Sequence, residues 1–307
     1  MGLSLSTSWN AFRYKNANKL LFEIKKLGFK EVELSFNLTA SMVRQAKNEV
    51  DSNKIKISSI HNYCPIPKEF SRLSALPDCF SMASTDDKQR ELAVKYSKRS
   101  IDTAKSLKAK AVVLHCGRVE IPDRTRKLIS LYNLGQRKSK AFNELKKEVI
   151  KERSAQSKPF LYNALKSLEE LNVHAKKSGI LLGVETRFYY REMPSFNEIG
   201  IILKEFKNSN IFYWHDTGHA QLMENLGFWR HKDYLDAYGK ELLGIHIHDI
   251  SGCQDHLAPL KGDLNFLRFK PFLKKETIKV IEAHHPATAD DLIKAKAFLE
   301  GAFHGII

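Results

Sequence analysis

The most restrictive feature of this 307-residue sequence is a repeated alternation of short, β-rich apolar runs with longer segments whose apolar residues recur every three or four positions. The runs, such as AVVLHCG and ILLGVET, end in polar residues, as expected of parallel strands that are covered on both faces. Eight such runs can be drawn, at residues 3–9, 31–36, 55–62, 111–117, 180–186, 211–216, 242–249 and 278–284.

The segments between these runs are typical of helices. Two of them end at glycine, Gly28 and Gly179, which is a common helix stop. Repeated strand–helix units form either a closed barrel or an open doubly wound sheet, and no GxGxxG follows the first run to indicate a dinucleotide site. Eight units favour closure, so the sequence predicts a single-domain (β/α)₈ TIM barrel over residues 1–307. The predicted helices include residues 17–28, 86–108, 159–178 and 289–302.

Residues 118–158, after the fourth run, are too many for an ordinary strand–helix loop. They are charged and periodic, which predicts an insertion of one or two extra helices over the barrel mouth. Such an insertion would serve as a lid or as a contact in a homo-oligomer. Residues 63–85 contain Pro65, Pro67 and Pro77 and predict a second long loop at the mouth.

The chain is strongly basic, with 50 Lys and Arg against 35 Asp and Glu and a formal charge of +15. An excess of this size can steer anionic substrates, including phosphorylated sugars and nucleic acid. The lysines are nevertheless spread along the helices without interleaved aromatic residues, which favours a solvated surface over a nucleic-acid interface.

Several features predict a cytoplasmic protein with no membrane partner. No apolar run approaches the roughly 20 residues of a membrane span, and the first residues, MGLSLSTSW, lack the pattern of a signal peptide. The four cysteines form no CxxC pair and are expected to be reduced thiols.

Metal-binding residue types stand at or near the ends of six predicted strands. In a (β/α)₈ barrel these ends form one face, where catalytic groups gather. Carboxylates and imidazoles buried together cost several kcal/mol unless a metal or a partner compensates their charge. The six residues are His61, His115, Glu185, Asp216, His246 and Glu282. An oxygen-rich set with one imidazole suits Mn²⁺, Mg²⁺, Co²⁺ or Zn²⁺, and the predicted ligands of one divalent ion are Glu185, Asp216, His246 and Glu282.

Two short motifs add further groups. HDTGHA contains Asp216 and His219, so that an imidazole follows the strand-end carboxylate. IHIHD contains His246, His248 and Asp249, and the period of a strand puts its two histidines on the same side. Asp249 is expected to orient one of these rings.

The order of the motifs along the chain resembles that of the xylose isomerase-like superfamily of barrels, except over residues 118–158. That superfamily contains sugar isomerases, epimerases, inosose dehydratases and the apurinic endonuclease IV family. The motifs are VELSF around Glu33, HNYCPIP around His61, VVLHCG around His115, GVET around Glu185, HDTGHA, IHIHD, and VIEAHH around Glu282.

The resemblance implies a metal-dependent isomerase or epimerase that acts on a sugar or sugar-like polyol, with or without a phosphate. The metal would bind a carbonyl and an adjacent hydroxyl, and Glu185 and Glu282 would remove and return a proton through an enediolate. No organic cofactor would be needed. By the same resemblance, His219 and His256 would hold substrate hydroxyls and Arg187 would bind phosphate.

Two alternatives stay open. A keto-polyol dehydratase would use the same metal and proton abstraction. An endonuclease on abasic DNA would use three zinc ions, and His61 and His115 would then belong to a second metal site. The third zinc of that class uses an Asp-x-His motif, but here Gln254 stands two residues before His256 and Asp255 stands next to it. Because a neutral amide is a poor metal ligand, this spacing disfavours a full trinuclear cluster.

Overall fold

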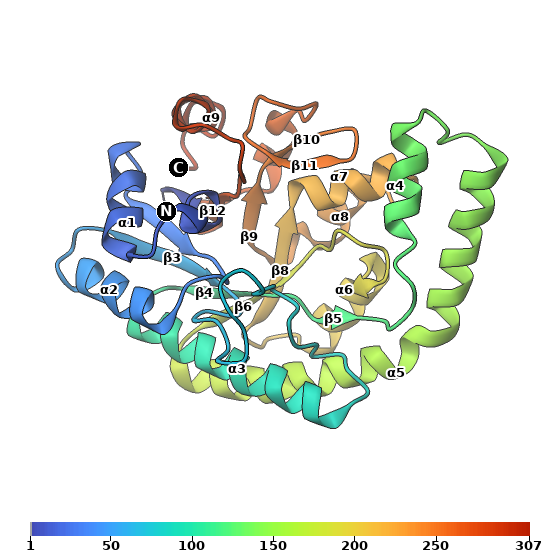
Figure 1. The fold of residues 1–307 in the computed structure, drawn as a ribbon, viewed down its shortest axis with the longest axis horizontal. Coiled ribbons are helices and arrows are strands. Elements are labelled where there is room, and N and C mark those ends of the chain that lie inside the picture. Colours follow the sequence, from blue (N-terminus) through green and yellow to red (C-terminus); the bar gives the residue numbers. More distant parts are fainter. Residues whose placement is uncertain (1) are drawn as a thin grey trace.

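The computed structural model describes residues 2–307, and its centre is a closed barrel of eight parallel strands (Figure 1). The prediction of a TIM barrel is confirmed. Each of the eight predicted runs contains one strand. Most of the strands are shorter than the predicted runs, because the last residues of several runs do not pair with a neighbouring strand. Around the barrel the strands are β1 (Leu3–Ser6), β2 (Glu31–Leu34), β3 (Lys56–His61), β4 (Ala111–Leu114), β6 (Leu181–Glu185), β8 (Ile211–Asp216), β9 (Leu242–Ile247) and β12 (Ile278–Ile281), which pairs with β1.

Helices surround the barrel and cover the outer faces of its strands (Figure 1). Gly28 and Gly179 have positive φ angles of 82° and 69° and lie at helix ends, as predicted from the sequence. Among the described residues, no helix is long and apolar enough to cross a membrane. The helices are α1 (Ala17–Lys26), α2 (Ala40–Asp51), α3 (Asp87–Ser106), α4 (Thr125–Asn133), α5 (Lys140–Ser178), α6 (Phe196–Glu205), α7 (Thr217–Asn225), α8 (His231–Tyr238) and α9 (Ala289–Ala302).

The predicted helical insertion is α4 together with the first half of α5, and it is continuous with the helix that follows it. The sequence predicted a helix from residue 159, whereas α5 runs unbroken from Lys140. Its second half packs along α3, and its first half turns away to stand beside α4 (Figure 1). Leu128 of α4 and Phe142 of α5 pack in one apolar cluster with Leu222 of α7. This cluster fixes the insertion to one side of the mouth.

Two small antiparallel ribbons lie at the rim of the barrel mouth, and the buried ring of Trp214 forms the floor beneath it. The ribbons pair β5 (Gly117–Arg118) with β7 (Glu192–Met193), and β10 (Asp249–Ser251) with β11 (Gln254–Leu257). Trp214 is fully buried inside the barrel, where its ring lies edge-on to His246, with 5.1 Å between ring centroids. Trp214 therefore supports the groups above it.

Glycines on the neighbouring strands make room for the Trp214 ring. A Cβ atom at Gly183 would lie 2.7 Å from that ring, and one at Gly244 would overlap it. Gly244→Ala is therefore expected to lower the free energy of unfolding by about 1–3 kcal/mol, as overpacking of a core does. Urea unfolding would measure the change, with Gly301→Ala as the control, since a Cβ there has nothing within 4 Å. Equal stability of the two variants would contradict this account of the floor.

Candidate metal centre and active site

Four side chains from four strands meet just above the barrel floor. Glu185 and Asp216 end β6 and β8, His246 lies near the end of β9, and Glu282 directly follows β12. Their donor atoms all lie within 4.8 Å of one another, and all four residues are buried. His246 Nδ1 is 2.5 Å from Glu185 Oε1, 2.9 Å from Glu282 Oε2 and 3.8 Å from Asp216 Oδ2. The structure thus brings together the four residues predicted as metal ligands, called the central group below.

The electrostatics of the central group fit a divalent cation. Burial raises the pKa of Glu185 and of Glu282, but the nearby histidines, above all His246, lower each pKa below its ordinary range. His219 and His248 do the same for the pKa of Asp216. Three ionised carboxylates around one imidazole are the donor set of Mn²⁺, Mg²⁺, Co²⁺ or Zn²⁺, and a cation would compensate their buried charge.

The affinity of the central group for metal is expected to rise with pH. Burial lowers the pKa of His246, but the carboxylates of Glu282, Glu33 and Glu185 outweigh it and raise that pKa well above its ordinary value. The ring therefore carries a proton at neutral pH, which a cation must displace. Calorimetric titration with Co²⁺ should show an affinity that increases about tenfold per pH unit near neutrality. An affinity that does not change with pH would contradict this, and His246→Gln should remove the dependence.

Glu185 also belongs to a second group of donors, with His61 and His115. Its Oε2 atom is 2.7 Å from His115 Nε2 and 3.5 Å from His61 Nε2. The other nitrogen of His115, Nδ1, lies 3.0 Å from Asp78 Oδ2. Glu185 therefore stands between two adjacent donor groups, and all three members of the second group are buried.

A third group lies beside the ribbon of β10 and β11. Asp255 Oδ2 is 2.7 Å from His256 Nδ1 and 3.7 Å from His219 Nε2. Asp255 thus pairs directly with its sequence neighbour His256, whose backbone has a positive φ of 53°. The donor atoms on this side that lie close enough to share an ion are those of Asp216, His219, His248 and His256. Burial lowers the pKa of His256, but Asp255, Glu282 and Asp216 raise it to about 9.

The expectation for Asp249 was wrong. Its carboxylate contacts no histidine ring and instead accepts backbone N–H groups of Ile250, Leu260 and Leu264, which holds the loop after β10. His248 is oriented by Asp216, whose two oxygens lie 2.9 and 3.0 Å from its Nε2 atom.

Arg187 is almost fully buried between carboxylates. Its Nη2 atom is 2.9 Å from Asp78 Oδ2 and 3.2 Å from Glu192 Oε1, and its Nη1 atom is 3.6 Å from Glu185 Oε2. Burial raises the pKa of Asp78, but His115 and Arg187 together lower it to about 2. Sequence reasoning missed Asp78 and Glu192, and its only indication of Asp78 was the proline-containing loop predicted at the mouth.

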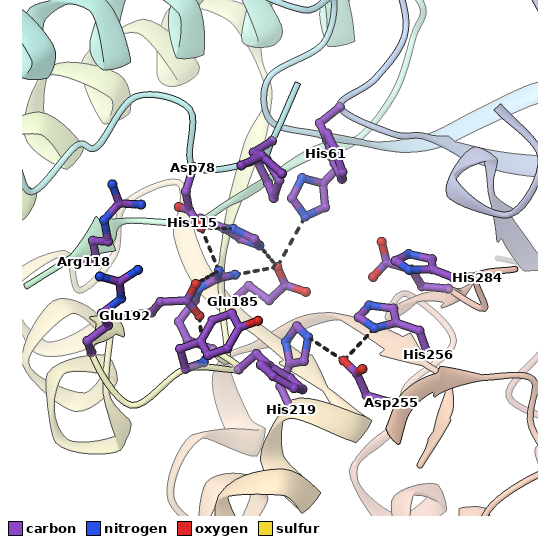
Figure 2. A pocket seen from close by; sticks show the side chains of 18 of the residues that line it. His61, Asp78, His115, Arg118, Glu185, Glu192, His219, Asp255, His256 and His284 are labelled. Carbon is purple, nitrogen blue, oxygen red and sulfur yellow. Dashed lines mark hydrogen bonds and ion pairs between the residues drawn. The ribbon is translucent and has the colours of Figure 1, made fainter. Parts of the chain in front are cut away.

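A cavity of about 450 Å³ opens above the donor groups, within the size range of small-molecule sites. Figure 2 shows the two groups facing the cavity from opposite sides. His61, His115 and Glu185 lie on one side and His219, Asp255 and His256 on the other, with Arg118 and Glu192 at one end. Phe36, Phe188 and Tyr189 add aromatic walls. His284, absent from the sequence prediction, also lines the cavity, and its buried Nε2 atom has no hydrogen-bond partner within residues 2–307.

Solved structures with similar folds include several sugar epimerases. A D-tagatose 3-epimerase-like protein superposes with a TM-score of 0.67 at 19% identity, over 100% of this chain and 98% of that one. An L-ribulose 3-epimerase gives 0.68 at 13% identity, over 100% and 96%. The 3-keto-D-glucoside 4-epimerase of E. coli gives 0.68 at 14% identity, over 98% and 99%. At these identities the likeness shows a shared fold.

Sequence relatives extend over nearly the whole chain. The uncharacterised protein MJ1311 of Methanocaldococcus jannaschii is 24% identical over 291 residues, which cover 88% of this chain and 86% of that protein. The uncharacterised protein MJ1614 of the same organism is 25% identical over 292 residues, which cover 94% and 95%. The profile of the xylose isomerase-like TIM barrel family matches residues 21–300. The chain therefore belongs to the xylose isomerase-like TIM barrel family.

Proposed function

We propose that the protein is a divalent-metal-dependent isomerase or epimerase of a sugar or sugar-like polyol. The observation that carries this proposal is the placement of Glu185 and Glu282 beside the same atom, His246 Nδ1, with the cavity above them. The two glutamates come from β6 and from the end of β12, which are not neighbours in the barrel. Several proteins with similar folds are sugar epimerases, which supports this proposal.

The donor set fits a divalent cation, held by Glu185, Asp216, His246 and Glu282. Such an ion acts as a Lewis acid that makes a proton beside a carbonyl easier to remove. Carboxylates that are ionised at neutral pH can serve as bases, so that one removes the proton. The other, once it has taken up a proton from solvent, delivers that proton to the same or the neighbouring carbon. Removal and return on opposite faces of one carbon inverts it, which is epimerisation.

Histidines around the cavity would orient the substrate. His219 Nδ1 lies 3.0 Å from the carbonyl oxygen of Thr186, to which it donates, and this leaves Nε2 directed towards Asp255 and the cavity. His256 lines the cavity on the same side. Both rings are placed to hydrogen-bond sugar hydroxyls. Arg187 would act through Asp78 and Glu192, which it holds in place.

The test is proton exchange in deuterated solvent. Metal-loaded protein would be incubated with a panel of ketoses, ketose phosphates and inososes, and deuterium beside the carbonyl would be followed by NMR. We expect exchange into at least one ketose, with epimer or aldose product. Loss of water from an inosose would identify a keto-polyol dehydratase instead. Absence of exchange and of product from the whole panel, with the metal bound, would refute the proposal.

A second candidate is a phosphodiesterase acting on abasic DNA. The observation that favours it is the presence of further donor groups that share residues with the central group. They are His61–His115–Glu185, Asp216–His219–His248–His256 and His256–Glu282–His284. Several metal ions held side by side can clamp the attacking and leaving oxygens of a phosphate ester. Metal analysis decides between the two. Three zinc ions per chain with cleavage of abasic duplex would support the nuclease, and one ion with sugar exchange would support the isomerase.

A further inference from the structure

One end of the cavity is lined by arginines from three separate segments. Arg118 ends β5, Arg126 lies in the first turn of α4, and Arg191 precedes β7. The pairing of β5 with β7, in which Arg118 lies opposite Glu192, holds two of these segments together. Arg126 lies over the Tyr189 ring, 4.7 Å from its centroid. These three arginines are called the arginine wall.

The arginine wall is only partly paired with the acids around it. Two carboxylates that line the cavity, Asp78 and Glu192, are both engaged by Arg187. Arg118 and Arg126 each use Nε for one partly exposed pair, with Glu120 and Asp123 respectively. Within the described chain, neither has a further hydrogen bond from its Nη atoms.

Arg191 has one side-chain hydrogen bond and no ion pair among the described residues. Its Nη1 atom donates to the carbonyl oxygen of Ile121 at 3.1 Å. Its Nε atom is buried and has no hydrogen-bond partner among residues 2–307, and no carboxylate pairs with it there. Arg191 therefore brings to the cavity lining a guanidinium charge that no carboxylate of the described residues compensates.

We propose that the arginine wall binds an anionic group, a carboxylate or a phosphate, at the end of the substrate far from the central group. Guanidinium groups present paired donors that match the oxygens of both anions. The +15 net charge of the chain would also favour encounters with an anionic substrate over a neutral one. This inference rests on the proposed function and deepens it, since it assigns the substrate to sugar acids or sugar phosphates.

The test compares three ketoses of equal carbon number: neutral, phosphorylated at the terminal carbon, and oxidised to a carboxylate there. We expect kcat/KM for one anionic form to exceed that of the neutral sugar by about tenfold or more, as charged hydrogen bonds allow. The variants Arg118→Gln/Arg126→Gln and Arg191→Gln should bring this ratio towards one. Arg230→Gln, at an exposed arginine that does not line the cavity, should leave it unchanged.

Calorimetric titration with inorganic phosphate separates failure of this inference from failure of the proposed function. If no sugar is turned over but phosphate binds about tenfold more weakly to the double variant, the arginine wall stands and the isomerase does not. If wild type and variants bind phosphate equally, or prefer anionic sugars equally, the arginine wall is overturned. The better of the two anionic sugars identifies the group.

A separate observation concerns Glu33, a carboxylate that belongs to none of the donor groups. It lies on β2 and is fully buried. Both of its carboxylate oxygens are 3.1 Å from His246 Nε2, and Ser59 Oγ donates to Oε2 at 2.7 Å. His246 is thus held on one side by Glu33 and faces Glu185 and Glu282 with its other nitrogen.

We infer that Glu33 is a positioning residue for the metal centre. When a cation displaces the Nδ1 proton, the Nε2–H donated to Glu33 stays in place, and the Nδ1 lone pair is the one that faces the central group. Ser59 fixes the carboxylate in turn. Glu33 acts through His246, because its own oxygens lie on the side of the ring away from Glu185 and Glu282.

Metal affinity and the tautomer of His246 test this role. We expect Glu33→Met to weaken Co²⁺ binding by about 10–100-fold in calorimetry and, in the Zn²⁺-loaded protein, to shift the imidazole ¹⁵N signals of His246 away from the Nε2–H form. Glu33→Gln, which keeps a hydrogen-bond acceptor, should restore part of the Co²⁺ affinity and part of the Nε2–H signal. Glu31→Gln, on the same strand but not in contact with His246, is the matched control. Wild-type affinity and an unchanged tautomer in the folded Glu33→Met or Glu33→Gln variant would overturn the inference.

Discussion

Glu282→Gln is expected to slow deuterium exchange into the sugar substrate by about 10²–10⁴-fold, the usual contribution of a positioned acid or base. The change keeps the size of the side chain and one oxygen but removes the group that accepts the proton. Glu282 contacts His246 at 2.9 Å and faces the cavity. Few other contacts depend on it, so the fold should be unaffected. NMR in deuterated solvent measures the rate, and circular dichroism checks the fold.

Glu185→Gln is expected to cause at least as large a loss, but for two reasons. Glu185 contacts His246 in the central group and both His61 and His115 in the second group. Its replacement should therefore weaken metal binding as well as proton transfer, whereas Glu282→Gln should affect mainly proton transfer once the ion is supplied in excess. Glu241→Gln, at an exposed position before β9, is the control. Exchange at the wild-type rate in either variant would remove that glutamate from the mechanism.

The central group could be predicted because the topology determines it. Once eight parallel strands close, the residues at their carboxyl ends must lie on one ring, whatever their distance in the chain. Glu185 and Asp216 are the last residues of their strands, and Glu282 directly follows its strand. Periodicity alone therefore located residues that are separated by nearly 100 positions.

Residues on loops could not be located in this way. Asp78 lies in the long loop after β3, and Asp255 lies in the ribbon after β9. Their positions depend on local backbone geometry, such as the positive φ of His256, which no periodicity encodes. The misassignment of Asp249 has the same cause, since its carboxylate is used by nearby backbone N–H groups.

The sequence analysis divided α5 between the predicted insertion and a helix starting at residue 159. Residue 159 is a proline, and proline is favoured in the first turn of a helix and disfavoured in its interior. In the structure Pro159 lies inside α5, which curves along its length (Figure 1). The first half of α5 is stabilised by its contacts with α4, α6 and α7, and sequence periodicity does not reveal these contacts.

One of these contacts is a buried ion pair between the insertion and the barrel. Arg153 of α5 binds the carboxylate of Glu198 through both terminal nitrogens, at 2.6 and 3.0 Å, and both side chains are less than a tenth exposed. Arg153 also donates to the carbonyl oxygen of Glu192, next to the cavity. Glu198 in turn caps α6 by accepting the backbone N–H of Ser195 at 2.7 Å.

Arg153→Met is expected to lower the free energy of unfolding by about 3–5 kcal/mol, because it leaves the charge of Glu198 buried without a partner. Lys151→Met, an exposed change on the same helix, should have little effect. The double variant Arg153→Met/Glu198→Met should recover part of the loss, since two apolar side chains can replace a buried pair, but not the part due to the lost cap of α6. Denaturant unfolding of the four proteins measures these differences. If Arg153→Met is as stable as Lys151→Met, the ion pair does not hold the insertion against the barrel. The apolar cluster around Phe142 and the hydrogen bonds of Arg137 and Lys146 to the carbonyl oxygens of Asn225 and Gly227 must then do so.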